Sequence, residues 1–114
     1  MAEYKAHRLK KSREYFLAHP ELQRENSWRK SGARNADGSL FKWHDYKVML
    51  AQQDSKCAIC HSDNPGGKRD WHVDHDHETG MVRWILCGNC NRGLGYFKDD
   101  PSVLRRAAEM LEEK

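Results

Sequence analysis

The alternation of apolar and polar positions divides the chain into a few short elements. Residues 3–18 carry an imperfect apolar stripe on a polar background, which predicts a helix whose apolar members are Tyr4, Leu9, Tyr15, Phe16 and Leu17. We expect His19-Pro20 to end or kink this helix, because the residue before a proline avoids the α region. Residues 31–40 are rich in glycine, asparagine, aspartate and serine and predict a loop.

Two further helices follow from apolar spacings of three and four. Trp43, Tyr46 and Leu50 recur at this interval and predict a short helix that ends near Gln53. Near the end of the chain, Asp100 suits an N-cap and Pro101 the first helical position. We therefore predict a last helix here, and its apolar face is formed by Leu104, Ala107, Ala108 and Leu111.

Residues 71–86 have the pattern of a β-hairpin. A short strand leads into the turn residues Glu78-Thr79-Gly80, and an apolar strand runs from Met81 to Leu86. We expect Cys90-Asn91 to open a helix, so that the order is ββα and the fold class is α+β. No run approaches the ~20 apolar residues of a membrane span.

Composition limits the size of the core. A chain of 114 residues fits one domain, and its 38% hydrophobic and 32% charged residues leave little apolar surface to bury. A chain this polar often needs a bound metal to hold a unique fold. The start of the chain lacks the apolar run of a secretory signal, and we expect a soluble, intracellular protein.

Charge is spread unevenly along the chain. Residues 1–34 hold nine lysines and arginines against four glutamates, a net charge of +5, whereas the remaining residues carry −2. A basic arm beside a slightly acidic body suits a polyanionic partner such as DNA. The alternative is an ordinary soluble helix of mixed charge.

The four cysteines form two CxxC pairs, Cys57 with Cys60 and Cys87 with Cys90. Two residues between cysteines let both thiolates reach one ion, and two such turns complete the tetrahedral sulfur shell of structural zinc. Disulfides are the weaker explanation in a reducing cytosol, and a redox role for one pair leaves the other unexplained. Because four protein ligands fill the shell, we expect this zinc to shape the fold without reacting.

Five ionisable side chains occur within residues 72–77, an unusual composition for a strand. A second zinc site or a solvated charged edge would explain them, but so would a nuclease site. Asp74 supplies a hard oxygen ligand for a cation such as Mg²⁺, and His75 supplies an imidazole that can take a proton from water. Adjacent strand residues face opposite sides, so this interpretation requires the strand to end or twist here.

The motifs together resemble those of the phage recombination endonuclease VII family, within the HNH or His-Me finger group. The resemblance covers roughly residues 43–111 and rests on the two CxxC pairs, the His72-Val73-Asp74-His75-Asp76-His77 box, Thr79-Gly80, Val82-Arg83, Leu86-Cys87, Cys90-Asn91 and Gly93-Leu94-Gly95. It implies a small zinc-stabilised ββα-metal core flanked by N- and C-terminal helices, with a basic helical arm at residues 1–34 and the nuclease domain at 35–114.

The resemblance also implies roles for single residues. Asp74 and Asn91 would bind the catalytic Mg²⁺ or Mn²⁺, and His75 would be the general base. His77 matches a further family position, for which we expect a phosphate contact, and the structural zinc would be held by Cys57, Cys60, Cys87 and Cys90. Trp84-Ile85 departs from the glycine and apolar residue usual in the family, and we expect Trp84 to alter how closely DNA approaches the hairpin.

We therefore expect a metal-dependent DNA endonuclease of phage or prophage origin, acting by nicking, double-strand or branched-DNA cleavage in the cytoplasm. The chain stops at Lys114, before the extended region through which junction-resolving members dimerise, so we expect a monomer or weak dimer and do not carry junction resolution over. The alternative is a zinc-stabilised nucleic-acid-binding module without catalysis. A protein-interaction zinc domain is a third possibility, which would show no affinity for DNA.

Overall fold

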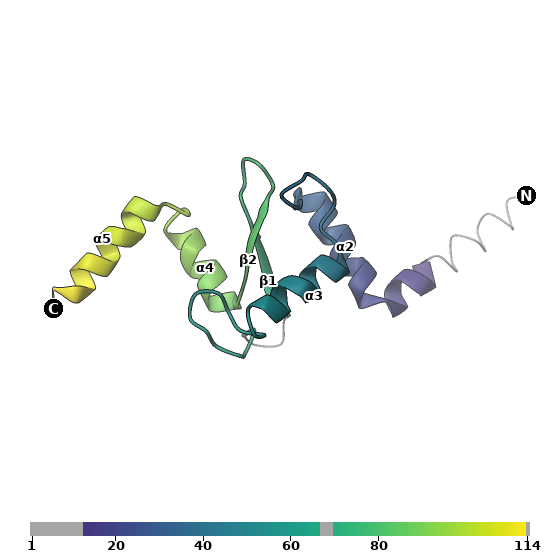
Figure 1. Ribbon diagram of the computed structural model, residues 1–114, viewed down its shortest axis with the longest axis horizontal. Helices are drawn as coiled ribbons and strands as arrows, with labels where there is room; N and C mark the ends of the chain where they lie inside the picture. Colours follow the sequence, from purple (N-terminus) through teal and green to yellow (C-terminus); the bar gives the residue numbers. More distant parts are fainter. Residues whose placement is uncertain (1–12, 67–69, 114) are drawn as a thin grey trace, which may run out of the picture. The chain divides into compact units, whose positions relative to one another are not determined.

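The computed structural model describes residues 13–66 and 70–113, and within them the chain forms helices and a single β-hairpin (Figure 1). A helical stretch at residues 13–18 comes first. The named elements are α2 (Pro20–Ser31), α3 (Trp43–Gln52), β1 (His72–His75), β2 (Val82–Leu86), α4 (Gly88–Tyr96) and α5 (Pro101–Glu112). Strands β1 and β2 pair in a two-stranded sheet, and α4 follows directly. The predicted α+β class and ββα order are confirmed.

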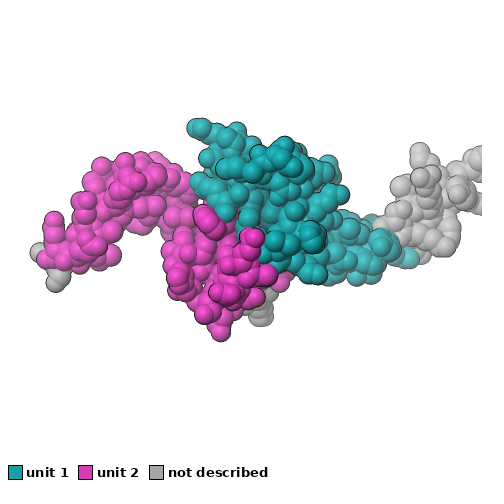
Figure 2. Space-filling model, in the orientation of Figure 1, with its two compact units in different colours: residues 1–49, 75–83 teal, residues 50–74, 84–114 magenta. Residues whose placement is uncertain are grey.

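The chain divides into two compact units, coloured separately in Figure 2. Unit 1 comprises residues 1–49 and 75–83, and unit 2 comprises residues 50–74 and 84–114. The boundary falls within α3 and within both strands, so the turn of the hairpin belongs to unit 1 and its open end to unit 2. In the part of the chain that the structure describes, no helix has the length and apolar character needed to cross a bilayer.

The helix predicted for residues 3–18 is seen from residue 13, while residues 3–12 lie outside the described residues. The predicted break is confirmed: His19 interrupts the helix, and α2 starts at Pro20, which occupies the first helical position. The Gln23 side chain ties the two helices together, since its amide donates to the carbonyl oxygens of Phe16 and Leu17, at 3.2 Å each.

Helix α2 was not predicted, because it has no apolar stripe. Its one buried residue is Trp28, which packs in unit 1 against Phe41 and Tyr46 at ring-centroid distances of 5.1 and 5.5 Å. The Arg24 guanidinium lies over two of these rings, 5.1 Å from the centroid of Trp28 and 4.8 Å from that of Tyr46. This aromatic cluster is the core of unit 1, and it joins α2 to the predicted helix α3.

The turn of the hairpin is anchored to the loop that follows α2. The main chain of Arg34 donates to the carbonyl of Gly80 at 2.7 Å and accepts from Val82 N at 2.8 Å. Gly80 has φ +79°, and a Cβ there would clash with the main-chain oxygen of Gly32, so only glycine fits this close approach. The loop predicted for residues 31–40 is confirmed from Gly32 onward, and it holds the hairpin turn in place.

Unit 2 is built around the end of β2. Ile85 and Leu86 are fully buried, as is Cys57 in the loop after α3. The predicted last helix is confirmed as α5, which Asp100 caps by accepting from Ser102 N at 2.9 Å. Helix α4 begins at Gly88, two residues earlier than predicted, because the Cys87 side chain acts as its N-cap.

Candidate functional site

The four cysteines converge at one point in unit 2. Cys57 and Cys60 lie in the loop after α3, Cys87 lies between β2 and α4, and Cys90 lies in the first turn of α4. Their sulfur atoms are all within 4.8 Å of one another, and the Sγ atoms of Cys60 and Cys87 are 3.7 Å apart. A tetrahedral zinc with Zn–S bonds of about 2.3 Å would separate its sulfurs by about 3.8 Å. The arrangement therefore fits a four-thiolate metal site.

The surroundings of the sulfurs favour negative charge on part of the cluster. Burial acts to raise the pKa of the Cys57 thiol, but hydrogen bonds from the backbone of Cys87, Cys60 and Ile59 lower that pKa to about 6. The pKa of Cys90 is raised, first by burial and then by hydrogen bonds to the other three sulfurs. Four sulfurs this close cannot all carry charge unless a cation offsets their repulsion, which is what a bound metal supplies.

The same unit carries the two predicted ligands of the catalytic cation. Asp74 is half-buried on β1, and Asn91 is half-buried on α4, directly after the cysteine Cys90. The main chain of Asn91 donates to Cys87 O at 3.0 Å, so the helical turn that carries Asn91 is the turn that carries the second cysteine pair. The four-sulfur cluster thus fixes the part of the backbone from which Asn91 projects.

The two aspartates of the His-Asp box have different environments. The Asp76 carboxylate accepts hydrogen bonds from the main-chain N–H groups of Glu78 at 2.8 Å and Thr79 at 3.1 Å. These two bonds hold the pKa of Asp76 below its ordinary value, and they close the turn of the hairpin. Asp76 is therefore a turn residue, whereas Asp74 lies within the strand.

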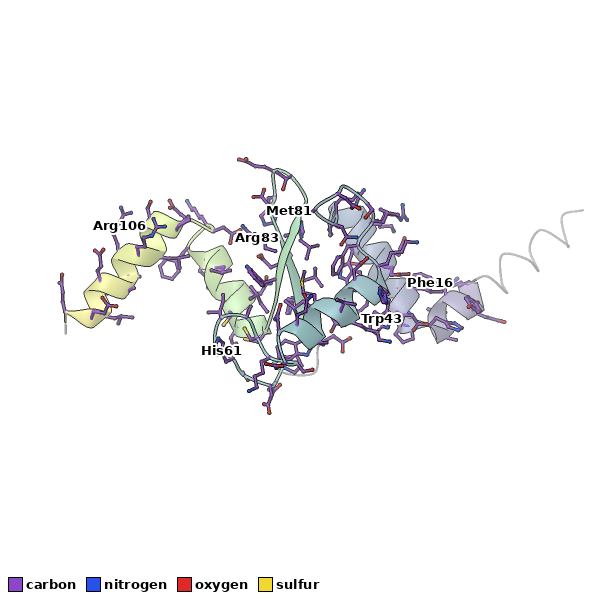
Figure 3. The ribbon with its side chains drawn as sticks, in the orientation of Figure 1. Phe16, Trp43, His61, Met81, Arg83 and Arg106 are labelled. Atoms are coloured by element: carbon purple, nitrogen blue, oxygen red, sulfur yellow. The ribbon has the colours of Figure 1, made fainter. Side chains whose placement is uncertain are left out.

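His75 is the last residue of β1, so the strand ends directly after the Asp74-His75 pair and both residues belong to it. The side chain is half-buried, and the His75 main-chain oxygen accepts a hydrogen bond from Arg83 Nη2 at 3.4 Å. His77 is exposed in the turn, and its ring centroid lies 5.1 Å from that of His75. Figure 3 draws the side chains of the hairpin and labels Arg83 on β2.

His72 is a neighbour of the predicted site to which the sequence pattern assigned no role. Its Nδ1 atom lies 3.5 Å from the side-chain nitrogen of Asn91, which joins β1 to α4. The alternation of side chains along a strand could have identified His72, because His72 and Asp74 are two residues apart and therefore face the same side of β1.

A family model described as recombination endonuclease VII matches residues 34–113. The chain belongs to this family. The match includes all four cysteines, the His-Asp box and Asn91, so the endonuclease VII resemblance found in the motifs is confirmed.

Two curated phage proteins and one solved structure are also similar to this chain. The Gene 59 proteins of the mycobacterium phages D29 and L5 are 39% identical over 70 residues and 45% identical over 68 residues. These alignments cover 60% and 59% of this chain but 42% and 41% of the phage proteins, so the chain spans less than half the length of the curated relatives it matches. The ββα-Me type II restriction endonuclease Hpy99I shares 30% sequence identity at a TM-score of 0.47, covering 79% of this chain and 48% of that one.

Proposed function

We propose that this endonuclease VII family member is a metal-dependent DNA endonuclease, which hydrolyses phosphodiester bonds by nicking, double-strand cleavage or cleavage of branched DNA. One observation carries the proposal: Asp74 and Asn91, the two oxygen-bearing residues to which the family resemblance assigns the cation, lie in the same compact unit as the four-sulfur cluster. The hydrogen bonds of Asp76 support the choice between the two aspartates, because they assign that carboxylate to the turn.

Two different metals fit the two sets of donors. Thiolates are the ligands of structural zinc, so Cys57, Cys60, Cys87 and Cys90 would hold Zn²⁺. The carboxylate of Asp74 and the amide oxygen of Asn91 are hard donors, which suit Mg²⁺ or Mn²⁺. When bound there, this cation would offset the negative charge that develops on the phosphate and on the departing 3′-oxygen.

Side chains of the protein would supply proton transfer and phosphate binding. His75, directly after Asp74, would take a proton from the attacking water at a ring nitrogen, a contribution typically worth about 10²–10⁴ in rate. His77 would contact a phosphate from the exposed turn. The basic arm at residues 1–34 would add phosphate contacts, which are independent of base sequence. Four reduced thiols suit a reducing compartment, so we place this activity inside the cell.

A plasmid-nicking assay tests the proposal. Zinc-loaded protein is dialysed free of other divalent cations and assayed with and without added Mg²⁺ or Mn²⁺, so that the structural zinc stays in place. We expect nicked and linear products only when the cation is added. Binding of DNA without cleavage under any of these cations would instead favour the zinc-stabilised binding module. A panel of linear, nicked and four-way DNA then reports the preferred substrate.

A further inference from the structure

The Asn91 side chain has two unlike ends, and only one of them can bind a cation. The amide oxygen has lone pairs to donate to a metal, whereas the NH₂ group has none. A half-turn about the last side-chain bond exchanges the two ends. A cation site that uses Asn91 therefore needs a neighbour that fixes which end of the amide faces the cation.

His72 is placed to be that neighbour. Its Nδ1 atom lies 3.5 Å from Asn91 Nδ2, and the direction of this contact depends on the ring tautomer. With the ring proton on Nε2, the tautomer that this inference requires, Nδ1 accepts from an NH₂ group and repels a carbonyl oxygen. The contact thus favours the orientation in which the NH₂ group faces β1 and the oxygen stays on the other edge of the amide. Ligand residues are commonly oriented in this way by a second hydrogen-bonded residue.

The imidazole of His72 is held by more than this contact. The half-buried side chain projects from the same face of β1 as Asp74. Its other nitrogen, Nε2, lies beside the first residue of α4: a Cβ built on Gly88 would be 3.6 Å from it. The ring therefore reaches α4 at Gly88 and again at Asn91, one turn further along, which restricts its movement.

We propose that His72 is a positioning residue, which orients the amide of Asn91 so that its oxygen is presented to the catalytic cation. The inference rests on the proposed function, because that function supplies the cation. His72 itself need not touch the cation, the substrate or the attacking water. Its role is to remove the wrong orientation of Asn91 before the cation binds.

A matched pair of variants tests this role. Leucine and asparagine have nearly the same shape, but at position 72 only asparagine offers an acceptor near the place of Nδ1. In zinc-loaded protein, the Asn91 side-chain NH₂ resonances are assigned by their loss in Asn91→Asp. We expect His72→Leu to shift these resonances toward those of a free amide and His72→Asn to keep them dispersed. His44→Leu, at an exposed position of α3, controls for the loss of a histidine.

Cation affinity gives the second measurement, by titration of zinc-loaded protein with Mn²⁺. We expect His72→Leu to weaken Mn²⁺ binding by about 10-fold and His72→Asn to restore most of it. In an Asn91→Asp background both ends of the side chain are oxygens, so no orientation has to be chosen. There His72→Leu should not weaken Mn²⁺ binding, because an oxygen faces the cation whichever way the side chain is turned.

Two results would overturn the role of His72 without affecting the proposed function. One is unshifted amide resonances in His72→Leu, and the other is a loss of Mn²⁺ affinity that is equal with and without the Asn91→Asp substitution. Either could occur while the unmodified protein still binds Mn²⁺ and cleaves DNA. If instead the unmodified protein neither binds Mn²⁺ nor cleaves, the proposed function fails and this role of His72 fails with it. The amide resonances would then still report whether the two side chains interact.

Discussion

The side chain of Gln53 pairs with the main chain of Ile85 through two hydrogen bonds. Gln53 Nε2 donates to Ile85 O at 2.8 Å, and Ile85 N donates to Gln53 Oε1 at 2.9 Å. The glutamine amide thus acts as one more residue of a strand beside β2, and it fixes the end of α3 next to the buried core of unit 2.

Replacing Gln53 with leucine should therefore destabilise the protein. The Ile85 carbonyl would keep its bond from Ala58 N, but the buried Ile85 N–H would lose its acceptor. An unsatisfied buried donor costs about 1–3 kcal/mol of the free energy of unfolding. Urea denaturation of zinc-loaded protein measures the loss, and Gln52→Leu, at an exposed neighbour on α3, is the control. Equal stability of the two variants would show that the pairing contributes nothing.

The four-sulfur cluster predicts about one zinc per chain, because four thiolates complete its coordination. Cys57→Ser or Cys90→Ser should lose this zinc and much of the ordered structure, since one zinc would tie the loop after α3 to the segment between β2 and α4 and to the first turn of α4. Metal analysis and circular dichroism on the same samples check both effects. A well-folded protein without zinc would contradict the assignment.

The two aspartates of the His-Asp box should respond differently to the same substitution. Asp74→Asn removes a charged cation ligand, and we expect cleavage to fall by about 10³ if several kcal/mol of transition-state stabilisation are lost. Asp76→Asn keeps an oxygen that can accept from Glu78 N and Thr79 N, so cleavage should fall by less than about 10-fold. Rates measured at saturating Mn²⁺ decide the point. A larger loss of cleavage in Asp76→Asn than in Asp74→Asn would contradict the assignment of Asp74 as the cation ligand.

Asp76 should also stabilise the hairpin turn in a pH-dependent way. Because the pKa of Asp76 is lowered in the folded protein, its stabilising effect is complete above the ordinary carboxyl pKa and is lost as the pH falls through the lowered value. At neutral pH, Asp76→Ala should therefore have a lower Tm than both the unmodified protein and Asp76→Asn. Thermal melts of the three proteins at pH 7 compare them, and an unchanged Tm for Asp76→Ala would count against the turn role.

His75→Ala should reduce cleavage by about 10²–10⁴ while preserving zinc content and circular dichroism, because the imidazole is assigned to proton transfer and to neither metal. His44→Ala, which removes an exposed histidine of α3, should leave all three measurements unchanged. An inactive His75→Ala that has also lost zinc would make this histidine structural. Full activity would remove the proposed mechanism.

The phosphate contacts proposed for the basic arm are best tested by substitution, since Trp28 belongs to the buried core and deletion through residue 30 would remove it. Arg29 and Lys30 are exposed at the end of α2. Replacing both with glutamine should weaken DNA binding and reduce the salt slope by about 0.9 for each phosphate that the arm no longer neutralises. Arg105→Gln with Arg106→Gln on α5 removes the same charge outside the arm. If the two double substitutions changed DNA binding and its salt slope equally, the arm would contribute only through the net charge of the protein.

Several features of this protein were determined by the sequence itself, because their physical causes are local. Two residues between cysteines, a proline after a histidine, and an aspartate before a proline each act within one turn of the chain. They predicted the four-sulfur cluster, the break at His19 and the start of α5, all of which the structure has. The family resemblance was carried by motifs of the same local kind.

Other features depend on contacts between segments that are distant in the sequence, and these became visible only in the folded protein. Helix α2 has no apolar stripe, and its place is set by one tryptophan that packs against rings from residues 41 and 46. The resemblance assigned the cation to Asp74 and gave Asp76 no role, and the hydrogen bonds that make Asp76 a turn residue are visible only in the structure. His72 and Asn91 are 19 residues apart and meet because β1 pairs with β2, whose end leads directly into α4. A short-range sequence pattern cannot predict such contacts, because strand pairing and burial create them only when the whole unit folds.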